Sequence, residues 1–137
     1  MNRALSILIA ALILLVLNFT GVEGISTAQD GIFGAGDASW YSQIDPGVLL
    51  TTANMEIFND KELTCAIWGV PFNTLIKVTN VANGKSIIVR VNDRGPAKRL
   101  VRSGRVIDLT KSAFSELAST REGLIRVELE ILPCVKK

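Results

Sequence analysis

The stretch 85–110, KSIIVRVNDRGPAKRLVRSGRVIDLT, constrains the fold more than any other part of the chain. It opens with β-branched residues in close succession, which favours a strand over 85–92. A Gly-Pro pair interrupts that pattern, and the chain then returns to a second short apolar segment. Each segment ends in an acid, Asp93 and Asp108. The loop between them is cationic and carries Lys98, Arg99, Arg102 and Arg105.

The two acids stand where rigid scaffolds usually carry functional groups, at strand ends and the loops that follow them. By the alternation of side chains, Asp93 is predicted to share the apolar face of Val89 and Val91 in a regular strand. Partial burial there raises the pKa of a carboxyl, whereas Arg94 and the cationic loop favour the carboxylate. The alternative is structural, with Asp93 as a turn residue and Asp108 as a helix cap.

Four more segments have the composition of strands, and one has that of a helix. Asn83-Gly84 predicts a hairpin turn before the strand at 85–92. Thr110 is suited to cap a helix that runs to about Ser119. Six strand segments with one short helix indicate a mainly β protein built as a small closed barrel. Apolar and charged residues alternate most strictly in the last of these strands, at 124–132. The four additional strands are predicted at 38–41, 63–68, 74–81 and 124–132.

The first 28 residues are predicted to be a signal peptide. Arg3 supplies the positive start, the apolar run 4–19 is shorter than the roughly 20 residues that span a bilayer, and Ser26-Thr27-Ala28 fits a cleavage site. An uncleaved N-terminal anchor is the alternative. No Cys follows the run, so we expect an exported protein that is not a lipoprotein and keeps no stable membrane span after processing. Residues 29–35 are expected to be a flexible lead-in to one domain at 36–137.

Charge and cysteine content exclude some classes of function. The chain has 15 Lys+Arg, 13 Asp+Glu and no His, and its formal net charge of +2 is too small to argue for nucleic acid. This balance suits a neutral or polyanionic surface such as cell-wall glycan. Cys65 and Cys134 are expected to form a disulfide in an oxidising compartment, with two free buried thiols as the alternative. Without His there are too few ligands for zinc, and we expect no metal and no cofactor.

Several motifs, in the same order, resemble those of the rare lipoprotein A (RlpA) family. They are GDASWYS, TANMEIF, KVTNVANGKS, VNDRGP and GRVIDLT, and the resemblance runs from about Gly36 to Leu132. It implies a double-psi β-barrel, a connectivity that periodicity alone does not give. Members of this family are implicated as lytic transglycosylases that act on bacterial peptidoglycan, especially on glycan strands stripped of stem peptides. The resemblance therefore implies a periplasmic or extracellular, wall-associated lyase.

A lytic transglycosylase needs fewer acids than a hydrolase, because the C6 hydroxyl of the sugar attacks and gives a 1,6-anhydro product. One group protonates the leaving oxygen and later accepts the hydroxyl proton. We assign this acid/base role to Asp93, and to Asp108 a supporting role or that of the second carboxylate of a hydrolase. Core packing is the alternative role for each aromatic candidate. The candidates for substrate binding are Glu56, Arg94, Trp40, Tyr41 and Trp68.

Two residues depart from the family pattern. Met55 stands where the family usually has Gly, so the loop there is expected to differ. Ile67 stands where the family usually has a His that faces the Asp across the groove, and an isoleucine transfers no proton.

Two hypotheses follow for function. One is an endolytic peptidoglycan transglycosylase, and the other is an inactive barrel that binds glycan. We favour the enzyme because NDRGP and IDLT are both intact. An expansin-like wall loosener is a third and weaker alternative. The expected partner is the glycan strand, and a monomer is the expected state.

Overall fold

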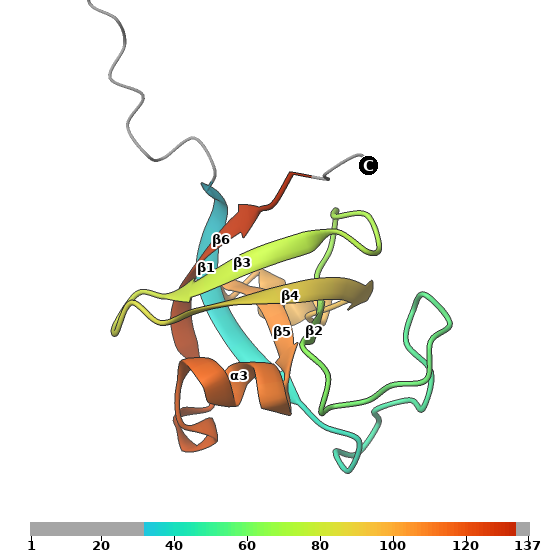
Figure 1. Ribbon diagram of the computed structural model, residues 1–137. Helices are drawn as coiled ribbons and strands as arrows, with labels where there is room; N and C mark the ends of the chain where they lie inside the picture. The colour runs from blue at the N-terminus through green and yellow to red at the C-terminus, as the bar shows by residue number, and fades with distance from the viewer. Residues whose placement is uncertain (1–31, 134–137) are drawn as a thin grey trace, which may run out of the picture. The chain divides into compact units, whose positions relative to one another are not determined.

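The computed structural model describes residues 32–133, which form a closed six-stranded barrel (Figure 1). Around the barrel the strands follow the order β1-β5-β2-β4-β3-β6. The predicted mainly β barrel is therefore confirmed. The signal peptide predicted at 1–28 and Cys134 lie outside the described residues, and within them no helix has the length and apolar character that crossing a bilayer requires.

The elements lie close to their predicted positions, with two differences. β1 begins at Ile32, so residues 32–35, expected in a flexible lead-in, belong to the barrel, where they pair with β6. The cationic loop contains a one-turn helix that the sequence did not predict. The strands are β1 Ile32–Tyr41, β2 Thr64–Ala66, β3 Leu75–Asn80, β4 Ser86–Asp93, β5 Arg105–Thr110 and β6 Ile125–Ile131; the helices are α2 Lys98–Val101, α3 Lys111–Leu117 and a 3-10 turn at Thr120–Glu122.

Two parallel pairs, β1 with β5 and β2 with β4, give the barrel its mixed connectivity. The remaining neighbours are antiparallel. Parallel neighbours need a crossover connection, so the two halves of the barrel interlock and do not form a simple meander. This arrangement agrees with the double-psi connectivity that the family resemblance implies.

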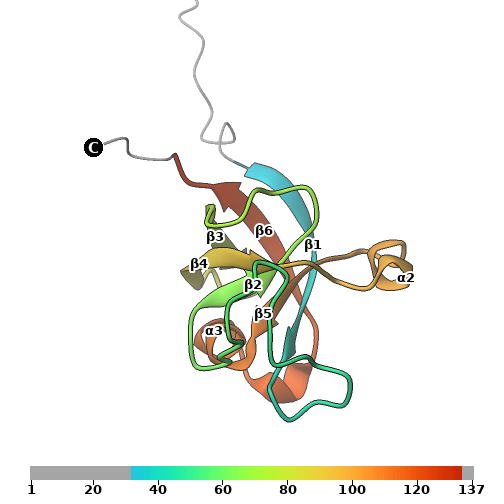
Figure 2. The same ribbon diagram turned by 90° about the vertical axis from the view of Figure 1, so that its right-hand side faces the viewer.

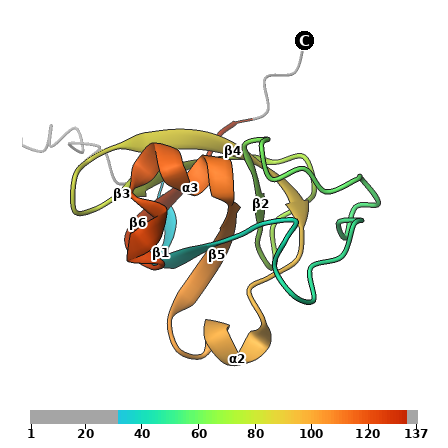
Figure 3. The ribbon, with the colours of Figure 1, turned by 90° about the horizontal axis from the view of Figure 1, so that it is seen from below.

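Alternate residues of the strands fill the barrel, as Ile76 and Val78 of β3 do with fully buried side chains. One end of the barrel is covered by α3, which lies below the strands in Figure 1 and faces the viewer in Figure 3. Phe114 of this helix is fully buried against the strands. The predicted cap is confirmed, because the N–H of Ala113 donates to the Thr110 hydroxyl at 3.4 Å.

The connection 42–63, between β1 and β2, extends along the right-hand side of the barrel in Figure 1. Its tip is a small hairpin, in which the N–H of Thr52 donates to Glu56 O at 2.9 Å and the N–H of Met55 to Thr52 O at 2.9 Å. Met55 has a φ of +72°, in the left-handed region. It thus adopts the conformation that the sequence led us to expect only of Gly, and hydrogen bonds on both sides hold it there.

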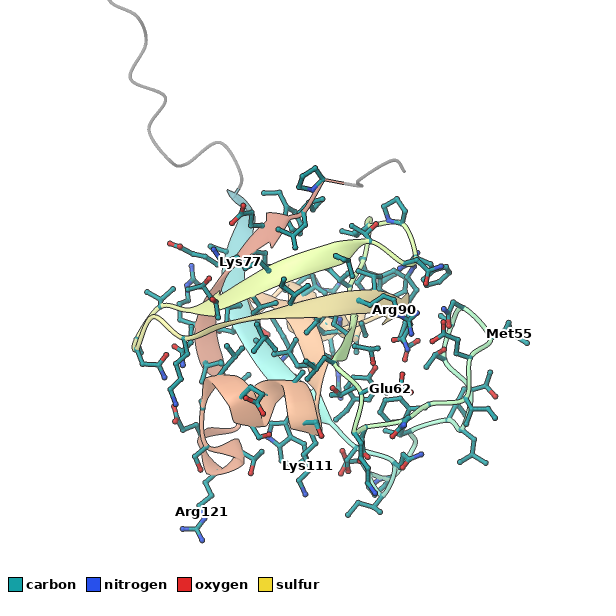
Figure 4. All side chains as sticks on the ribbon, in the orientation of Figure 1. Met55, Glu62, Lys77, Arg90, Lys111 and Arg121 are labelled. Atoms are coloured by element: carbon teal, nitrogen blue, oxygen red, sulfur yellow. The ribbon has the colours of Figure 1, made fainter. Side chains whose placement is uncertain are left out.

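Glu56 ties this hairpin to the barrel. Its two carboxylate oxygens accept from the Arg90 guanidinium of β4 at 2.7 and 2.9 Å. The side-chain amides of Asn54 and Asn92 donate to the same carboxylate at 2.8 and 3.2 Å. The hydrogen bonds from Arg90, followed by those from the amides, lower the pKa of Glu56 to about 2. Figure 4 shows Arg90 on β4 beside the hairpin, with Met55 pointing away from the barrel.

Met55→Gly is expected to stabilise the domain. A non-glycine residue in the left-handed region costs about 1–2 kcal/mol, and the greater freedom of Gly in the unfolded chain offsets about 0.5–1 kcal/mol of the gain. We expect a net gain of about 0.5–1 kcal/mol, seen as a Tm rise of a few degrees in thermal unfolding. Met55→Ala removes the exposed side chain but keeps the Cβ, so its Tm should stay unchanged. An equal rise in this control would assign the effect to the exposed side chain and not to φ.

Because Glu56 is paired with Arg90, we expect part of the unfolding free energy of the domain to depend on pH. The pKa of Glu56 is lowered from its ordinary 4.5 to about 2, so the carboxylate stabilises the fold above about pH 4.5 and this contribution is lost as the pH falls through 2. Urea unfolding of wild type and Glu56→Gln should therefore give a difference in unfolding free energy that narrows from about pH 5 downwards. Glu62→Gln is the control, because the exposed Glu62 carboxylate lies 4.0 Å from Arg90 and contributes little. A Glu56→Gln difference that does not change with pH would contradict this account.

Candidate active site

Four residues of adjacent strands form one row across the outer face of the barrel. Ser39 of β1 lies opposite Asp108 of β5. Asp108 and Asp93 of β4 both lie opposite Ala66 of β2, one on each side. Asp108 points outwards because its neighbours along β5 are in the core, and residues opposite each other in a sheet point to the same face. The two acids therefore share one surface, about 10 Å apart at the backbone, which is two strand spacings.

A β-bulge turns Asp93 to this face. In the pairing of β2 with β4, Cys65 lies opposite Val91, but the next residue, Ala66, lies opposite Asp93. Asn92 is therefore the extra residue of the bulge. Without it, Asp93 would lie on the core face with Val91, as the alternation predicted. That prediction is wrong, because the extra residue reverses the side to which Asp93 points.

The carboxylate of Asp93 has one oxygen held by the backbone and one that faces the Tyr41 hydroxyl. Oδ1 accepts from the backbone N–H groups of Ala53, at 2.9 Å, and Arg94, at 2.8 Å. Oδ2 faces the hydroxyl of Tyr41 at 3.5 Å, and the side chain is half-buried. The two amides fix the orientation of the carboxylate. Oδ2 is then the oxygen available to exchange a proton with a ligand.

Tyr41, predicted as a sugar platform, contacts both the core and the acid. Its ring stacks on the almost fully buried Phe58, with centroids 4.7 Å apart and planes at 6°. Burial, and after it the charge of Asp93, raises the pKa of the Tyr41 phenol well above its ordinary value. The hydroxyl therefore stays protonated and is a donor directed at Asp93.

Asp108 is held by a side chain, whereas Asp93 is held by backbone amides. It is half-buried and accepts a hydrogen bond from the hydroxyl of Ser39. Burial raises the pKa of the Asp108 carboxyl, while the Ser39 hydrogen bond and the charge of Arg105 act against this rise. Gly95 passes close over it, since a Cβ at Gly95 would lie 3.4 Å from Asp108 Oδ2. These contacts indicate that Asp108 supports the turn that follows β4.

A groove of about 540 Å³ lies beside Asp93. One side is formed by Arg94, whose guanidinium lies over the Phe72 ring at 3.7 Å and donates to Ile67 O at 3.2 Å. The other side is formed by the connection between β1 and β2 and is largely apolar. The residues that line the groove are Gly47, Val48, Leu49, Thr51, Thr52, Ala53, Met55, Asp93 and Arg94.

Ile67 contributes its backbone, and not its side chain, to this region. The side chain is 4% exposed and belongs to the hydrophobic core cluster. Its N–H donates to the carbonyl oxygen of Asp93 at 3.3 Å. The position at which the resemblance implies a His is therefore directed into the core. In the described part of the chain, Tyr41 is the side chain whose polar group contacts the Asp93 carboxylate.

The remaining candidates lie apart from the Asp93 carboxylate. Glu56 is held by Arg90 and does not line the groove. Trp40 packs against the core, and its indole N–H donates to Thr120 O at 3.0 Å. Trp68 is 45% exposed, and its indole N–H donates to Pro96 O at 2.7 Å. Of the two tryptophans, Trp68 therefore presents more free aromatic surface to a ligand.

Cys65 is fully buried in the core, and burial raises the pKa of its thiol to about 12. Its partner in the predicted disulfide, Cys134, lies outside the described residues, so the disulfide stays a prediction. Between residues 32 and 133, no group of three or more His, Cys, Asp or Glu side chains is placed to hold a metal ion.

Sequence reasoning missed three groups that position the acids. Ser39 lies within the GDASWYS motif but was not singled out, although its hydroxyl binds Asp108. Phe58 was noted only as part of TANMEIF, although it supports the Tyr41 ring. The Ala53 amide left no signal in the sequence, because a backbone N–H is present in every residue except proline.

The chain matches a family of known proteins over most of the barrel. Residues 34–129 match a family model described as lytic transglycolase. The endolytic peptidoglycan transglycosylase RlpA of Rickettsia felis is 43% identical over 99 residues, which are 72% of this chain and 42% of that protein. The protein of the same name from Campylobacter jejuni is 39% identical over 111 residues, which are 81% of this chain and 36% of that protein. This chain thus matches less than half the length of these relatives.

A solved structure shares the fold. The expansin of Clavibacter michiganensis superposes with a TM-score of 0.56 at 19% identity, covering 75% of this chain and 52% of the expansin. At this identity the likeness concerns the fold alone. The family match, by contrast, includes the strands that carry Asp93 and Asp108. The chain belongs to the RlpA-like double-psi β-barrel family of lytic transglycosylases.

Proposed function

We propose that this domain is an endolytic peptidoglycan transglycosylase that cleaves glycan strands, preferably those without stem peptides, to 1,6-anhydro-muramyl products. The observation that carries the proposal is the Asp93 carboxylate, which lines a groove, is held at Oδ1 by two backbone amides and faces the Tyr41 hydroxyl with Oδ2. The names of the relatives support the substrate class. The predicted signal peptide supports export to the periplasm or cell wall.

The proposed reaction needs one proton carrier. Asp93 gives the proton on Oδ2 to the glycosidic oxygen as the bond from that oxygen to C1 of the muramyl residue breaks. The C6 hydroxyl of the same residue then bonds to C1, and its proton passes to Oδ2. The acid therefore ends as it began, and no water is consumed. While Oδ2 is charged, the protonated Tyr41 hydroxyl is placed to donate to it.

Asp93→Asn is expected to reduce product release by at least about 100-fold, because the amide keeps the shape of the side chain but has no proton to give. The assay incubates the protein with amidase-treated, peptide-free peptidoglycan and measures 1,6-anhydro-muramyl fragments by mass spectrometry. Asp108→Asn is the comparison, because it keeps an acceptor for Ser39 and should lower the rate less. Ordinary reducing ends would contradict transglycosylation and indicate hydrolysis with a second carboxylate.

Tyr41→Phe tests the donor that faces Asp93. The variant keeps the ring on Phe58 and removes the hydroxyl, so Tm should change little. We expect the rate of anhydro-product release to fall roughly tenfold, as for the loss of one hydrogen bond to a charged group. Phe58→Leu is the control for the stack and should lower Tm. An unchanged rate in Tyr41→Phe would remove this hydroxyl from the mechanism.

The absence of His from the chain favours a second candidate, an inactive barrel that binds glycan. In that case the wild type sediments with peptide-free glycan, releases nothing, and Asp93→Asn binds equally well. The product assay and the sedimentation assay together therefore separate the two functions.

A further inference from the structure

The segment 97–104, between β4 and β5, stands out from the barrel in Figures 2 and 3 and is hereafter named the basic arm. Lys98, Arg99 and Arg102 are exposed on it, and it contains no acidic residue. Between residues 32 and 133 these three cations form no ion pair, whereas three cations elsewhere on the barrel do.

Stability does not explain this composition. α2, the helical turn of the basic arm, buries no residue and has no acid in its first turn. Lys98 and the C-cap residue Arg102 are four residues apart, so two like charges are neighbours on one side of the helical turn, which is unfavourable. Residues that oppose local stability in this way are expected at functional sites.

The basic arm is nevertheless fixed at both ends. Where it leaves β4, the Trp68 indole N–H donates to Pro96 O at 2.7 Å. Where it returns to the barrel, the N–H of Asp37 donates to Gly104 O at 2.9 Å. The cations are therefore presented from a defined place on the domain.

That place borders the candidate site. Arg94, just before the basic arm, lines the groove beside Asp93. Arg105, just after it, is close enough to Asp108 to act on the pKa of that carboxyl. Lys98 Nζ lies 5.9 Å from the ring centroid of the exposed Trp68. An anionic polymer entering a site that carries two carboxylates would meet compensating positive charge at this edge.

We propose that the basic arm binds carboxylates along the glycan strand, namely the lactyl groups that muramyl residues expose when no stem peptide is attached. This inference rests on the proposed function. A guanidinium matches the planar shape of a carboxylate, and a lactyl group in amide linkage to a peptide no longer carries that charge. The Debye length of about 8 Å at physiological ionic strength limits the attraction to groups near the basic arm, so added salt weakens it.

The test measures binding with the protein carrying Asp93→Asn, so that the ligand is not consumed. The ligands are peptide-free glycan strands and chitooligosaccharides, which have the same kind of amino-sugar backbone without lactyl carboxylates. Arg99→Gln with Arg102→Gln removes two of the three positive charges of the basic arm and leaves Lys98. The matched control is Lys85→Gln with Arg121→Gln, which removes the same charge from the β3–β4 turn and from the 3-10 turn beside α3, where Figure 4 labels Arg121.

We expect the basic-arm variant to bind peptide-free glycan roughly threefold to tenfold more weakly at low salt, with the difference lost at high salt. Its affinity for chitooligosaccharides and its Tm should stay unchanged, as should both affinities of the control variant. Three results would overturn the proposal: equal losses in both variants, equal affinity of the Asp93→Asn protein with an intact basic arm for both ligands, or equally tight binding of polyglutamate by that protein. Because the readout is binding, the two proposals fail separately: glycan cleavage by the wild type, together with binding that does not depend on the basic arm, refutes this inference alone. Binding that depends on the basic arm without any cleavage by wild type refutes the transglycosylase alone.

Discussion

Two backbone amides bind one oxygen of Asp93, and the conformation of the long β1–β2 connection depends on the same contacts. One amide is that of Ala53, in the hairpin around Met55, and the N–H of Asn54 in that hairpin donates to Asn92 O at 3.2 Å. Glu56 adds the ion pair to Arg90 on the strand that ends in Asp93. A change that releases the hairpin therefore also removes the Ala53 amide from the carboxylate, so the stability of the loop and the orientation of the acid are coupled.

The features that could be predicted from the sequence are those that a few adjacent residues determine. β6 alternates buried and exposed residues over most of its length, and β3 alternates buried residues with half-buried ones after its exposed first residue. Both strands were therefore visible from their own composition. The turn at Asn83-Gly84 and the cap at Thr110 depend on backbone conformations and hydrogen bonds that span only a few positions. The start of β1 was missed because Gly has a low strand propensity and both Gly34 and Gly36 stand there. In the structure, close packing accounts for the Gly at 36, since a Cβ there would lie 2.3 Å from Val106.

The parts of the site that escaped prediction depend on segments far apart in the chain. The bulge at Asn92 exists only in the pairing of β4 with β2, and it reversed the face predicted for Asp93. The stack of Tyr41 on Phe58 joins the end of β1 to the far side of the hairpin. Both acids were selected as candidates from the sequence because strand ends are common places for function. The groups that bind them were not predicted, because they come from tertiary contacts.

The absence of a His is a smaller obstacle to transglycosylation than to hydrolysis. A hydrolase needs two carboxylates on opposite sides of the sugar, and here the second acid, Asp108, lies close to Gly95 and is bound by Ser39. A transglycosylase needs one group that gives and then regains a proton, held in a fixed orientation. The amides of Ala53 and Arg94 supply that orientation, and the Tyr41 phenol, kept protonated by burial, supplies a neutral donor. With Ile67 packed in the core, a His placed at that position in this backbone would bury an imidazole and would not face the groove. The contacts around Asp93 are therefore compatible with intramolecular attack by the C6 hydroxyl and offer little support for attack by water.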